Sequence, residues 1–310
     1  MKRYVPYVAI VLAMLFWSAA GIAIKQALVV FTPLMLIVLR FSMAVTLMLL
    51  TGLVCRGIDR RRGAGRETGL ALEMPSLRDW PLFVLTGFFQ PFLYFLLETL
   101  CYRALTSPTV AETLLSTSPI LAPLFAVVLL RERVSWATIA GIVVSTAGVV
   151  LLVTAGSSRF AIGDPKGLLW AFLAVSSAVM YTIMLRRIPS HYNTLTVVLC
   201  TQFVSLLLFV PLWLLTDGGM AGSQADAAAW HRAIGAVCYL AVFCSVAAFM
   251  LFCYSVREIG VTRANAFNNI RPVFTALLMW SLMGEHLPWL KLVGIGIIIG
   301  GLFLCQKGGK

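Results

Sequence analysis

The dominant pattern along this chain is a series of apolar runs of about 20 residues, separated by short polar connections. A helix rises ~1.5 Å per residue, so such a run crosses the ~30 Å hydrocarbon core of a bilayer. The pattern therefore predicts an all-α membrane protein with ten transmembrane helices. The ten predicted spans are Tyr7–Val29, Thr32–Leu53, Pro81–Tyr102, Thr109–Leu130, Trp136–Val153, Gly167–Leu185, Leu195–Leu215, Ile234–Ser255, Ala264–Met283 and Trp289–Cys305.

Six residue pairs with one common separation indicate an internal duplication. Each pair is 153 positions apart (170 − 17 = 153), about half of the 310-residue chain. Each copy would hold five spans, and an odd number reverses the direction of the second copy. Inverted repeats of this kind are typical of transporters with a site near the bilayer midplane. We expect repeats at 1–155 and 156–310 within one membrane domain. The pairs are Trp17/Trp170, Pro119/Pro272, Glu132/Glu285, Trp136/Trp289, Gly141/Gly294 and Gly148/Gly301.

Several segments resemble a known family when they are taken in order. The chain opens with FWSAAGIAIK and FTPLMLIVLRF, continues with SPILAPLFAVVLLRERVSWATIAGIVVSTAGVVLL, and the second half repeats the last pattern with RPVFTALLMWSLMGEHLPWLKLVGIGIIIGG. These segments are similar to the drug/metabolite transporter superfamily, EamA type. The resemblance implies a ten-helix fold that exports or exchanges small metabolites, often amino acids or drugs, by alternating access. It also implies that the glycine-rich fifth and tenth spans either hold the bundle together or form a homodimer face.

The composition agrees with a membrane protein. Hydrophobic residues make up 60% of the chain, charged residues only 12%, and the mean hydropathy is +0.94. These values lie outside the range of soluble domains. The first apolar run follows Lys2 and Arg3, as in a secretory signal, but it extends too far for one. We therefore expect it to be retained as the first span.

The net charge of +12 does not indicate a nucleic-acid partner, because the basic residues follow the predicted membrane topology. Of 24 Lys and Arg residues, 16 fall on one predicted side and six on the other. The positive-inside rule then places both termini in the cytoplasm of a protein in the cell (inner) membrane. The basic run Arg60–Arg62 either helps set this topology and contacts anionic lipid or is simply a solvated loop.

Neither a cofactor nor a metal is expected. The seven cysteines lie in or beside apolar spans, and none shows a metal-binding spacing. We read them as small hydrophobic residues of the bundle. The expected partners are the lipid bilayer and a small-molecule substrate.

Each charged residue within a predicted span is expected to have a structural or functional role, because inserting a charged side chain at a helix centre costs roughly 2.5–3.5 kcal/mol. Four lie in the outer half of the first four spans and can form a buried charge network or couple transport to protons. Lys25 and Glu112 either join this network or extend to the interface. Arg40 and Glu98 form either a structural pair or a contact with substrate. The four residues are Lys25, Arg40, Glu98 and Glu112.

Arg271 is the sharpest candidate for substrate binding. It lies about eight residues, or ~12 Å, into its span, close to the midplane. Its planar guanidinium suits a carboxylate group, although a structural pair with Glu98 is the alternative. The following Pro272 removes a backbone hydrogen bond and predicts a hinge. The inner side of the same span carries Asn265, Asn268 and Asn269.

The equivalent segment of the first repeat supplies the opposite wall of the predicted site. Thr117 and Ser118 precede Pro119, the second predicted hinge, and their hydroxyls either bind substrate or bond to their own helix. Four aromatic residues within spans either contact the apolar part of a substrate or pack the bundle. These aromatic residues are Trp17, Tyr94, Trp170 and Tyr181.

The predicted function is a secondary transporter that exports small metabolites such as amino acids. The chain has no Walker motif, so it is not expected to hydrolyse ATP. The main alternative is efflux of drugs or cationic amphiphiles. An intramembrane enzyme is a remote alternative, because His191, His231 and His286 all lie at span ends or in connections. No catalytic residue is therefore assigned.

Overall fold

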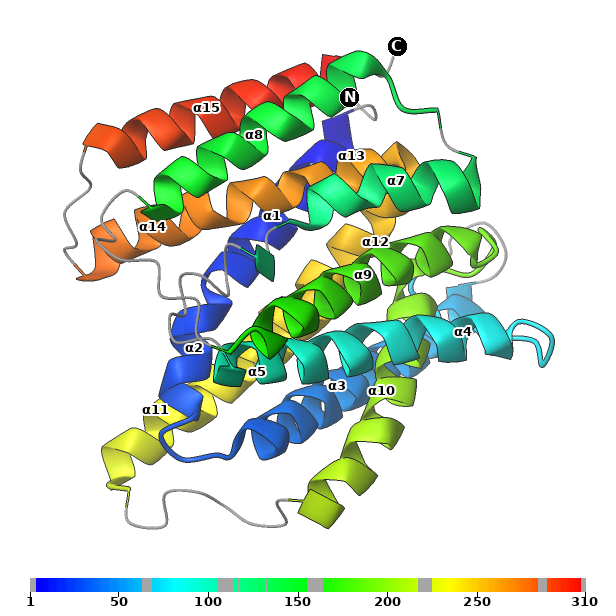
Figure 1. Cartoon of the computed structure of the whole chain (residues 1–310). Helices are drawn as coiled ribbons and strands as arrows, with labels where there is room; N and C mark the ends of the chain where they lie inside the picture. The colour runs from blue at the N-terminus through cyan, green and yellow to red at the C-terminus, as the bar shows by residue number, and fades with distance from the viewer. Residues whose placement is uncertain are drawn as a thin grey trace.

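The computed structural model describes residues 4–62, 69–104, 114–115, 117–131, 133–154, 164–216, 225–283 and 289–307. Within these ranges every regular element is a helix, and the helices form one bundle (Figure 1). The first half contains, in order, α1 (Val5–Ser18), α2 (Ala20–Ala27), α3 (Pro33–Arg62), α4 (Trp80–Gly87), the π-helical segment η2 (Phe88–Leu93), α5 (Tyr94–Ala104), α7 (Ser118–Leu130) and α8 (Trp136–Thr154).

The second half repeats this order of elements. It contains α9 (Lys166–Arg187), α10 (Thr194–Thr216), α11 (Ala227–Tyr239), the π-helical segment η3 (Leu240–Ala247), α12 (Ala248–Ile259), α13 (Val261–Ala266), the 3₁₀ turn η4 (Phe267–Ile270), α14 (Arg271–Met283) and α15 (Trp289–Lys307). The predicted all-helical fold of two repeats is therefore confirmed. The boundary expected at 155/156 lies outside the described residues and stays a prediction.

Six helices among the described residues are long and apolar enough to cross a membrane. Three more predicted spans correspond to shorter apolar helices, and the ninth is the broken helix α13–η4–α14. The count of ten membrane crossings therefore stays a prediction. α3 ends at Arg62 rather than at the predicted Leu53, because the polar residues after Leu53 include no proline to stop the helix.

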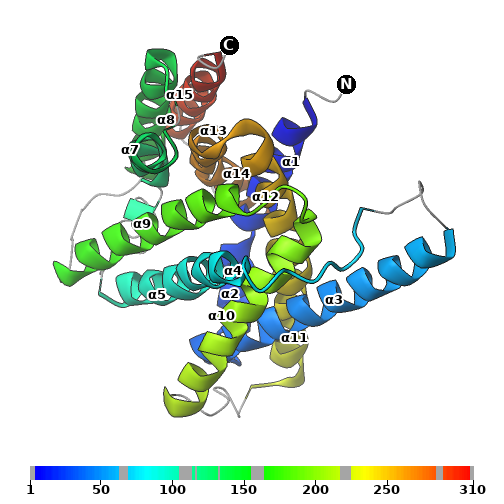
Figure 2. The same cartoon turned by 90° about the vertical axis from the view of Figure 1, so that its right-hand side faces the viewer.

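The contacts between helices follow a pseudo-two-fold relation. α1 packs against α12, and the equivalent helix of the second repeat, α9, packs against α5. Two further contacts join equivalent helices directly: α3 with α10, and α8 with α15. Figures 1 and 2 show α8 and α15 side by side at one side of the bundle, and α3 and α10 at the other. Exchanging the two repeats leaves this contact pattern unchanged.

Glycines in α8 and α15 face each other, and the order of the facing pairs shows that the two helices are antiparallel. A Cβ at Gly141 would lie 2.5 Å from the carbonyl oxygen of Gly301, and one at Gly148 would lie 3.0 Å from that of Gly294. The positions in each facing pair add to one sum (141 + 301 = 148 + 294 = 442), as in antiparallel helices. The glycines therefore hold the bundle together, the first of the two roles that the family resemblance left open.

Both repeats contain a π-helical segment at the equivalent place. The π-helical segments η2 and η3 begin 152 positions apart (240 − 88), and Gln90 within η2 has extended backbone angles. A π-helical segment frees carbonyl groups that need other partners in a membrane. Ser205 donates to the Gly87 carbonyl and Ser177 to the Phe89 carbonyl, so neighbouring helices supply these partners.

A second break occurs in the fourth span of each repeat. α7 begins at Ser118 and α14 begins at Arg271, and the two positions are 153 apart (271 − 118). Each is followed by a buried proline, Pro119 or Pro272, at the second helical position. Proline suits the first turn of a helix, because its missing N–H has no helical partner there. The predicted hinge prolines therefore begin new helices.

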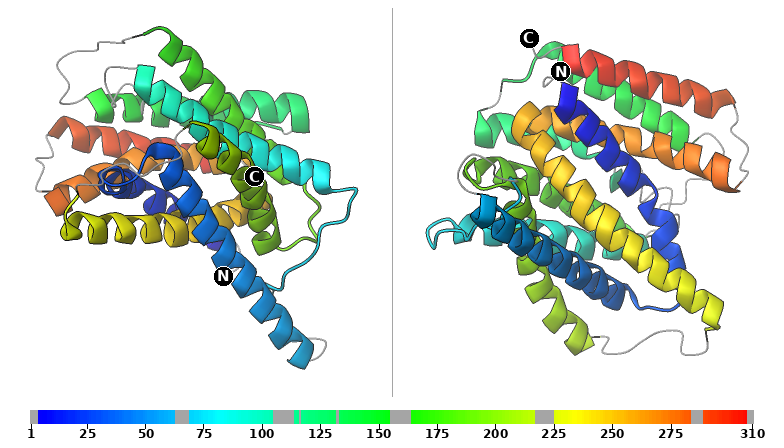
Figure 3. Two further views of the ribbon diagram at one scale, coloured as in Figure 1. Left: turned by 90° about the horizontal axis from the view of Figure 1, so that it is seen from below. Right: turned by 180° about the vertical axis from the view of Figure 1, so that it is seen from behind.

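The first helix begins and the last helix ends at the same end of the bundle (Figures 1 and 3). The connections from α7 to α8, from α9 to α10 and from α12 to α13 lie at this end as well. We call it the basic end, because it carries Arg131, Arg133, Arg186, Arg187, Arg257 and Arg263.

Candidate functional site

Arg271 and Trp17 form the centre of the candidate site. The guanidinium carbon of Arg271 lies 5.9 Å from the centre of the Trp17 ring. The Trp17 indole donates a 3.0 Å hydrogen bond to the Cys244 carbonyl in η3, and its ring packs against Phe249 and Phe252. The indole is thus fixed in place, and its face can attract a cation such as this guanidinium.

The break in the first span docks onto the start of α14. α1 ends at Ser18, whose hydroxyl donates a 3.1 Å hydrogen bond to the Arg271 carbonyl. Thr275, one turn later in α14, donates a 3.2 Å bond to the Ser18 carbonyl. These two bonds connect the first span of one repeat to the broken span of the other, so they fix the backbone position of Arg271.

Arg40 approaches the π-helical segment η3 from α3. Its Nε donates a 2.6 Å hydrogen bond to the Ser245 hydroxyl, and its guanidinium carbon lies 5.2 Å from the Phe95 ring centre. The side chain is buried within electrostatic range of Glu98, whose carboxylate accepts a 3.0 Å bond from the Tyr94 hydroxyl. The structure therefore brings together three of the predicted residues, Arg40, Tyr94 and Glu98.

Arg40 and Arg271 both lie within electrostatic range of η3. The Cys244 thiol lies within electrostatic range of Arg40 and of Arg271, and Ser245 is the next residue. Two guanidinium groups from spans of different repeats therefore flank one π-helical segment. This arrangement favours binding of an anionic group, because guanidinium pairs well with carboxylates and phosphates.

The three asparagines of the broken span make hydrogen bonds between helices. Asn268 donates to Ser118 at 3.3 Å, Asn265 to Thr182 at 3.1 Å, and Asn269 to Ser145 at 2.7 Å. Asn265 and Asn269 are fully buried, whereas Asn268 is half-buried. Of the three, Asn268 therefore lies best placed to contact a solute.

The other predicted residues lie around this centre. Thr117 bonds to the carbonyl of Leu114 in its own segment, one of the two roles that the sequence left open. Tyr181 is buried and packs edge-on against Phe249, and Trp170 packs in a separate cluster with Tyr94.

Two predicted residues of the charge network are only partly described. Glu112 lies outside the described residues. For Lys25 the structure describes only the backbone, within α2.

The sequence did not indicate Cys244, Ser245, Ser18 or Thr182. Small polar residues in apolar spans are common and bond to their own helix, so they carry little signal. Among the described residues, no three His, Cys, Asp or Glu side chains come together as metal ligands.

Comparison with known proteins identifies the family. The EamA-like transporter family matches the chain twice, at residues 5–154 and 165–305. Similar proteins include an uncharacterized transporter of Archaeoglobus fulgidus, 22% identical over 97% of this chain and 98% of the relative. The uncharacterized transporter YetK of Bacillus subtilis is 26% identical over 74% of this chain and 69% of its own length.

Two further similarities bear on function and fold. The probable terminal-alkyne amino-acid exporter of Streptantibioticus cattleyicolor is 25% identical over 77% of both chains. A solved crystal structure superposes with a TM-score of 0.75 at 22% identity, covering 98% of this chain and 97% of that one, which shows the shared fold. With both repeats matched, the chain belongs to the EamA-like transporter family of multi-pass membrane proteins.

Proposed function

We propose that this protein is a secondary transporter that exports small carboxylate-bearing metabolites, such as amino acids, by alternating access. The observation that carries the proposal is the position of Arg271. It begins a new helix at the break in the ninth predicted span, next to Trp17 and across η3 from Arg40. Broken helices near the midplane form the substrate sites of many transporters.

In this mechanism the Arg271 guanidinium binds the substrate carboxylate, and Trp17 contacts its apolar part. The helix breaks at Ser118 and Arg271 let each fourth span bend as the two repeats move against each other. Arg40 and Glu98 are the buried charges that set the local field, and Glu98 is one candidate for proton coupling.

The charges of the site favour an anionic or zwitterionic substrate over a cationic drug. Two arginines lie within electrostatic range of η3, and the described carboxylate of Glu98 is within range of Arg40. A site for cationic amphiphiles needs the opposite charge. The amino-acid exporter among the relatives agrees in substrate class, although its identity to this chain is low. The function is transport without a catalytic residue, and both termini are proposed to face the cytoplasm.

Substrate-dependent stabilisation tests the proposal. The purified protein is screened by thermal shift with amino acids, organic acids, nucleobases and cationic amphiphiles. A ligand at 100 times its dissociation constant stabilises by ~2.7 kcal/mol. We expect stabilisation by carboxylates that Arg271→Ala abolishes and Arg271→Lys partly retains. Counterflow in proteoliposomes should follow the same order.

The matched control is Arg78→Ala, which removes an exposed arginine at the basic end. It should leave both thermal shift and counterflow unchanged. Stabilisation by cationic amphiphiles alone, equal in wild type and Arg271→Ala, would contradict the proposal and favour drug efflux.

A further inference from the structure

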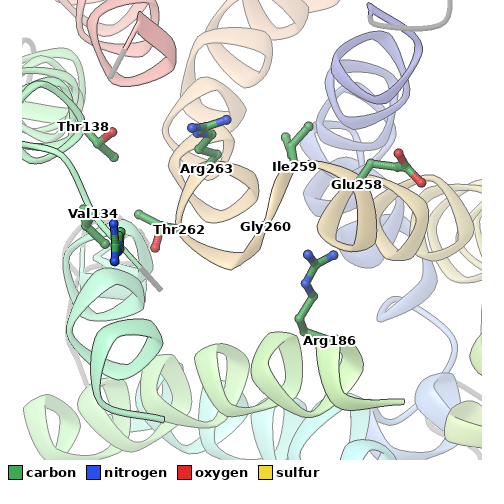
Figure 4. A pocket seen from close by; sticks show the side chains of 9 residues that line it. Val134, Thr138, Arg186, Glu258, Ile259, Gly260, Thr262 and Arg263 are labelled. Atoms are coloured by element: carbon green, nitrogen blue, oxygen red, sulfur yellow. The ribbon is translucent and has the colours of Figure 1, made fainter. Parts of the chain in front are cut away.

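A polar cleft opens at the basic end of the bundle, away from the site around Arg271 (Figure 4). Its volume is about 210 Å³. It lies between the α7–α8 connection, the end of α9 and the turn from α12 to α13, so both repeats contribute to it. The side chains that give it its character are Arg133, Thr138, Arg186, Glu258, Thr262 and Arg263.

The cleft is positively charged and also contains one carboxylate. Arg133, Arg186 and Arg263 against Glu258 give a net charge of +2 (3 − 1). Within the described ranges, none of these four side chains makes a hydrogen bond or an ion pair. A concave surface with charges of one sign raises the local concentration of the opposite ion. The carboxylate allows an ammonium group to bind beside an anionic one.

Polar residues lead from the cleft to Arg271 along the broken span. Thr262, Asn265, Asn268 and Arg271 follow each other at intervals of three residues. Residues three apart are neighbours on a helix surface, so each of these residues lies beside the next one, and Asn268 donates a 3.4 Å hydrogen bond to Asn265. Thr262 lines the cleft, and Arg271 lies at the candidate substrate site. A chain of neighbouring polar residues that winds around the broken span therefore connects the two.

Two bonds between helices close this route in the structure. Asn265 donates to Thr182 of α9, and Asn268 donates to Ser118 of α7. Asn265 and Thr182 are each 2% exposed and Ser118 is 6% exposed, whereas Asn268 is half-buried, so the first bond is closed to solvent more tightly than the second. Thr262 is already at the cleft wall, one turn before the closed section.

We infer that the cleft is the inner mouth of the transport path and that it binds a small zwitterionic solute before the path opens. The guanidinium groups take the carboxylate, and Glu258 takes the ammonium. The Asn265–Thr182 and Asn268–Ser118 bonds form the inner gate between this mouth and Arg271. The inference rests on the proposed transport function and adds a second site and a gate to it.

The charge of the cleft is tested by thiol labelling, which needs no transported substrate. In Ile259→Cys, a cleft position, we compare an anionic sulfonatoethyl with a cationic trimethylammonioethyl methanethiosulfonate, with wild type as background. The anionic reagent should react faster. Arg186→Gln with Arg263→Gln should lower the anionic-to-cationic rate ratio by on the order of tenfold. Arg78→Gln, outside the cleft, should not change the ratio. An unchanged ratio in the double variant would overturn the inference.

The gate is tested by reagent access to a cysteine beyond it. Thr117→Cys is labelled with the anionic reagent applied only at the basic end in oriented vesicles. Thr182→Val removes the Asn265 acceptor and should raise the labelling rate several-fold. Ser177→Ala, on the same helix but bonded to η2, is the matched control and should not raise it. Equal rates in Thr182→Val and its parent, with both monodisperse, would show that no gate lies there.

The outcomes separate the two proposals. Loss of carboxylate binding in the thermal-shift screen removes the proposed substrate class but leaves the labelling ratios as evidence for the cleft. Absence of a charge-dependent labelling ratio removes the mouth but leaves binding at Arg271 intact.

Discussion

At the scale of single residues, the buried polar groups of this bundle mainly bond to other helices. Trp17 bonds to η3, Ser177 to η2, and Asn269 to α8. In a bilayer no water is present to take over a lost partner, so such bonds fix helix positions. The residues proposed to bind substrate and the residues that hold the helices are therefore neighbours on the same broken span.

Asn269→Ala should lower the stability of the protein in detergent. The fully buried side chain donates to Ser145 and Thr146, and bonds of this kind contribute about 0.6 kcal/mol on average in membrane proteins. Thermal unfolding followed by size-exclusion chromatography measures the change. The control is Ser281→Ala, which removes an exposed hydroxyl bonded within its own helix. A control loss as large as that of Asn269→Ala would contradict a special role for the asparagine.

Tyr192→Phe should change how stability depends on acidity. Hydrogen bonds from Ser76 and Tyr192 lower the pKa of Asp79 below its ordinary value of 3.8. A carboxyl group with a lowered pKa stabilises the fold above its unfolded pKa, and this contribution disappears as pH falls through the lower folded value. Removing the Tyr192 hydroxyl should raise the pKa of Asp79 toward its ordinary value. The variant should therefore lose less stability than wild type as the pH falls below 4.

Melting temperatures of wild type and Tyr192→Phe, measured from pH 6 to pH 3, test this expectation. Ser76→Ala removes the other side-chain hydrogen bond and should shift the profile in the same direction. Identical acid profiles for all three proteins would rule out a contribution from Asp79.

At the scale of elements, the close contact of α8 with α15 is the most demanding packing. Gly141→Ala puts a methyl group 2.5 Å from the Gly301 carbonyl oxygen, so the helices must separate. Overpacking of this kind costs typically 1–3 kcal/mol. Gly296→Ala meets nothing within 4 Å and gains roughly 1 kcal/mol of helix propensity. Thermal unfolding should therefore show a loss for the first variant and none for the second.

The sequence predicted the helices and their repetition well, because hydropathy and the 153-residue interval act over many residues at once. The end of α3, at Arg62 instead of the predicted Leu53, shows where hydropathy fails as a guide, since polar residues continue this helix beyond its apolar part. The contact of Arg40 with Ser245 was not predictable. It depends on the packing of α3 against η3, which brings together positions 205 residues apart. The roles assigned to Arg271 and its neighbours stay predictions.

At the scale of the whole molecule, the pseudo-two-fold relation separates fixed contacts from moving ones. The α8–α15 contact joins equivalent helices. If transport exchanges the conformations of the two repeats, this contact is mapped onto itself and is therefore preserved. The Asn265–Thr182 bond joins helices that are not equivalent, so it need not persist. The path is therefore expected to open at α13 and α9 while α8 and α15 stay together.

Spin-label distances measure this difference. Labels on the exposed positions Val143 of α8 and Val293 of α15 should give one distance distribution in every state. Labels at Arg186 and Arg263 on the cleft walls should gain a longer distance in Thr182→Val. A change between Val143 and Val293 of the same size would contradict a fixed α8–α15 contact.

The constant sum of the facing glycine positions has a consequence for assembly. In the α8–α15 contact, Gly141 faces Gly301, the repeat equivalent of Gly148, and Gly148 faces Gly294, the repeat equivalent of Gly141. The contact surface is therefore self-complementary, so one five-helix unit could dock onto an oppositely inserted copy of itself. Polypeptides 1–155 and 156–310, expressed separately, should therefore copurify, and Gly141→Ala should weaken their association. The linker between the repeats would then serve to fix their stoichiometry and insertion order, while the recognition between them resides in the two glycine-lined helices.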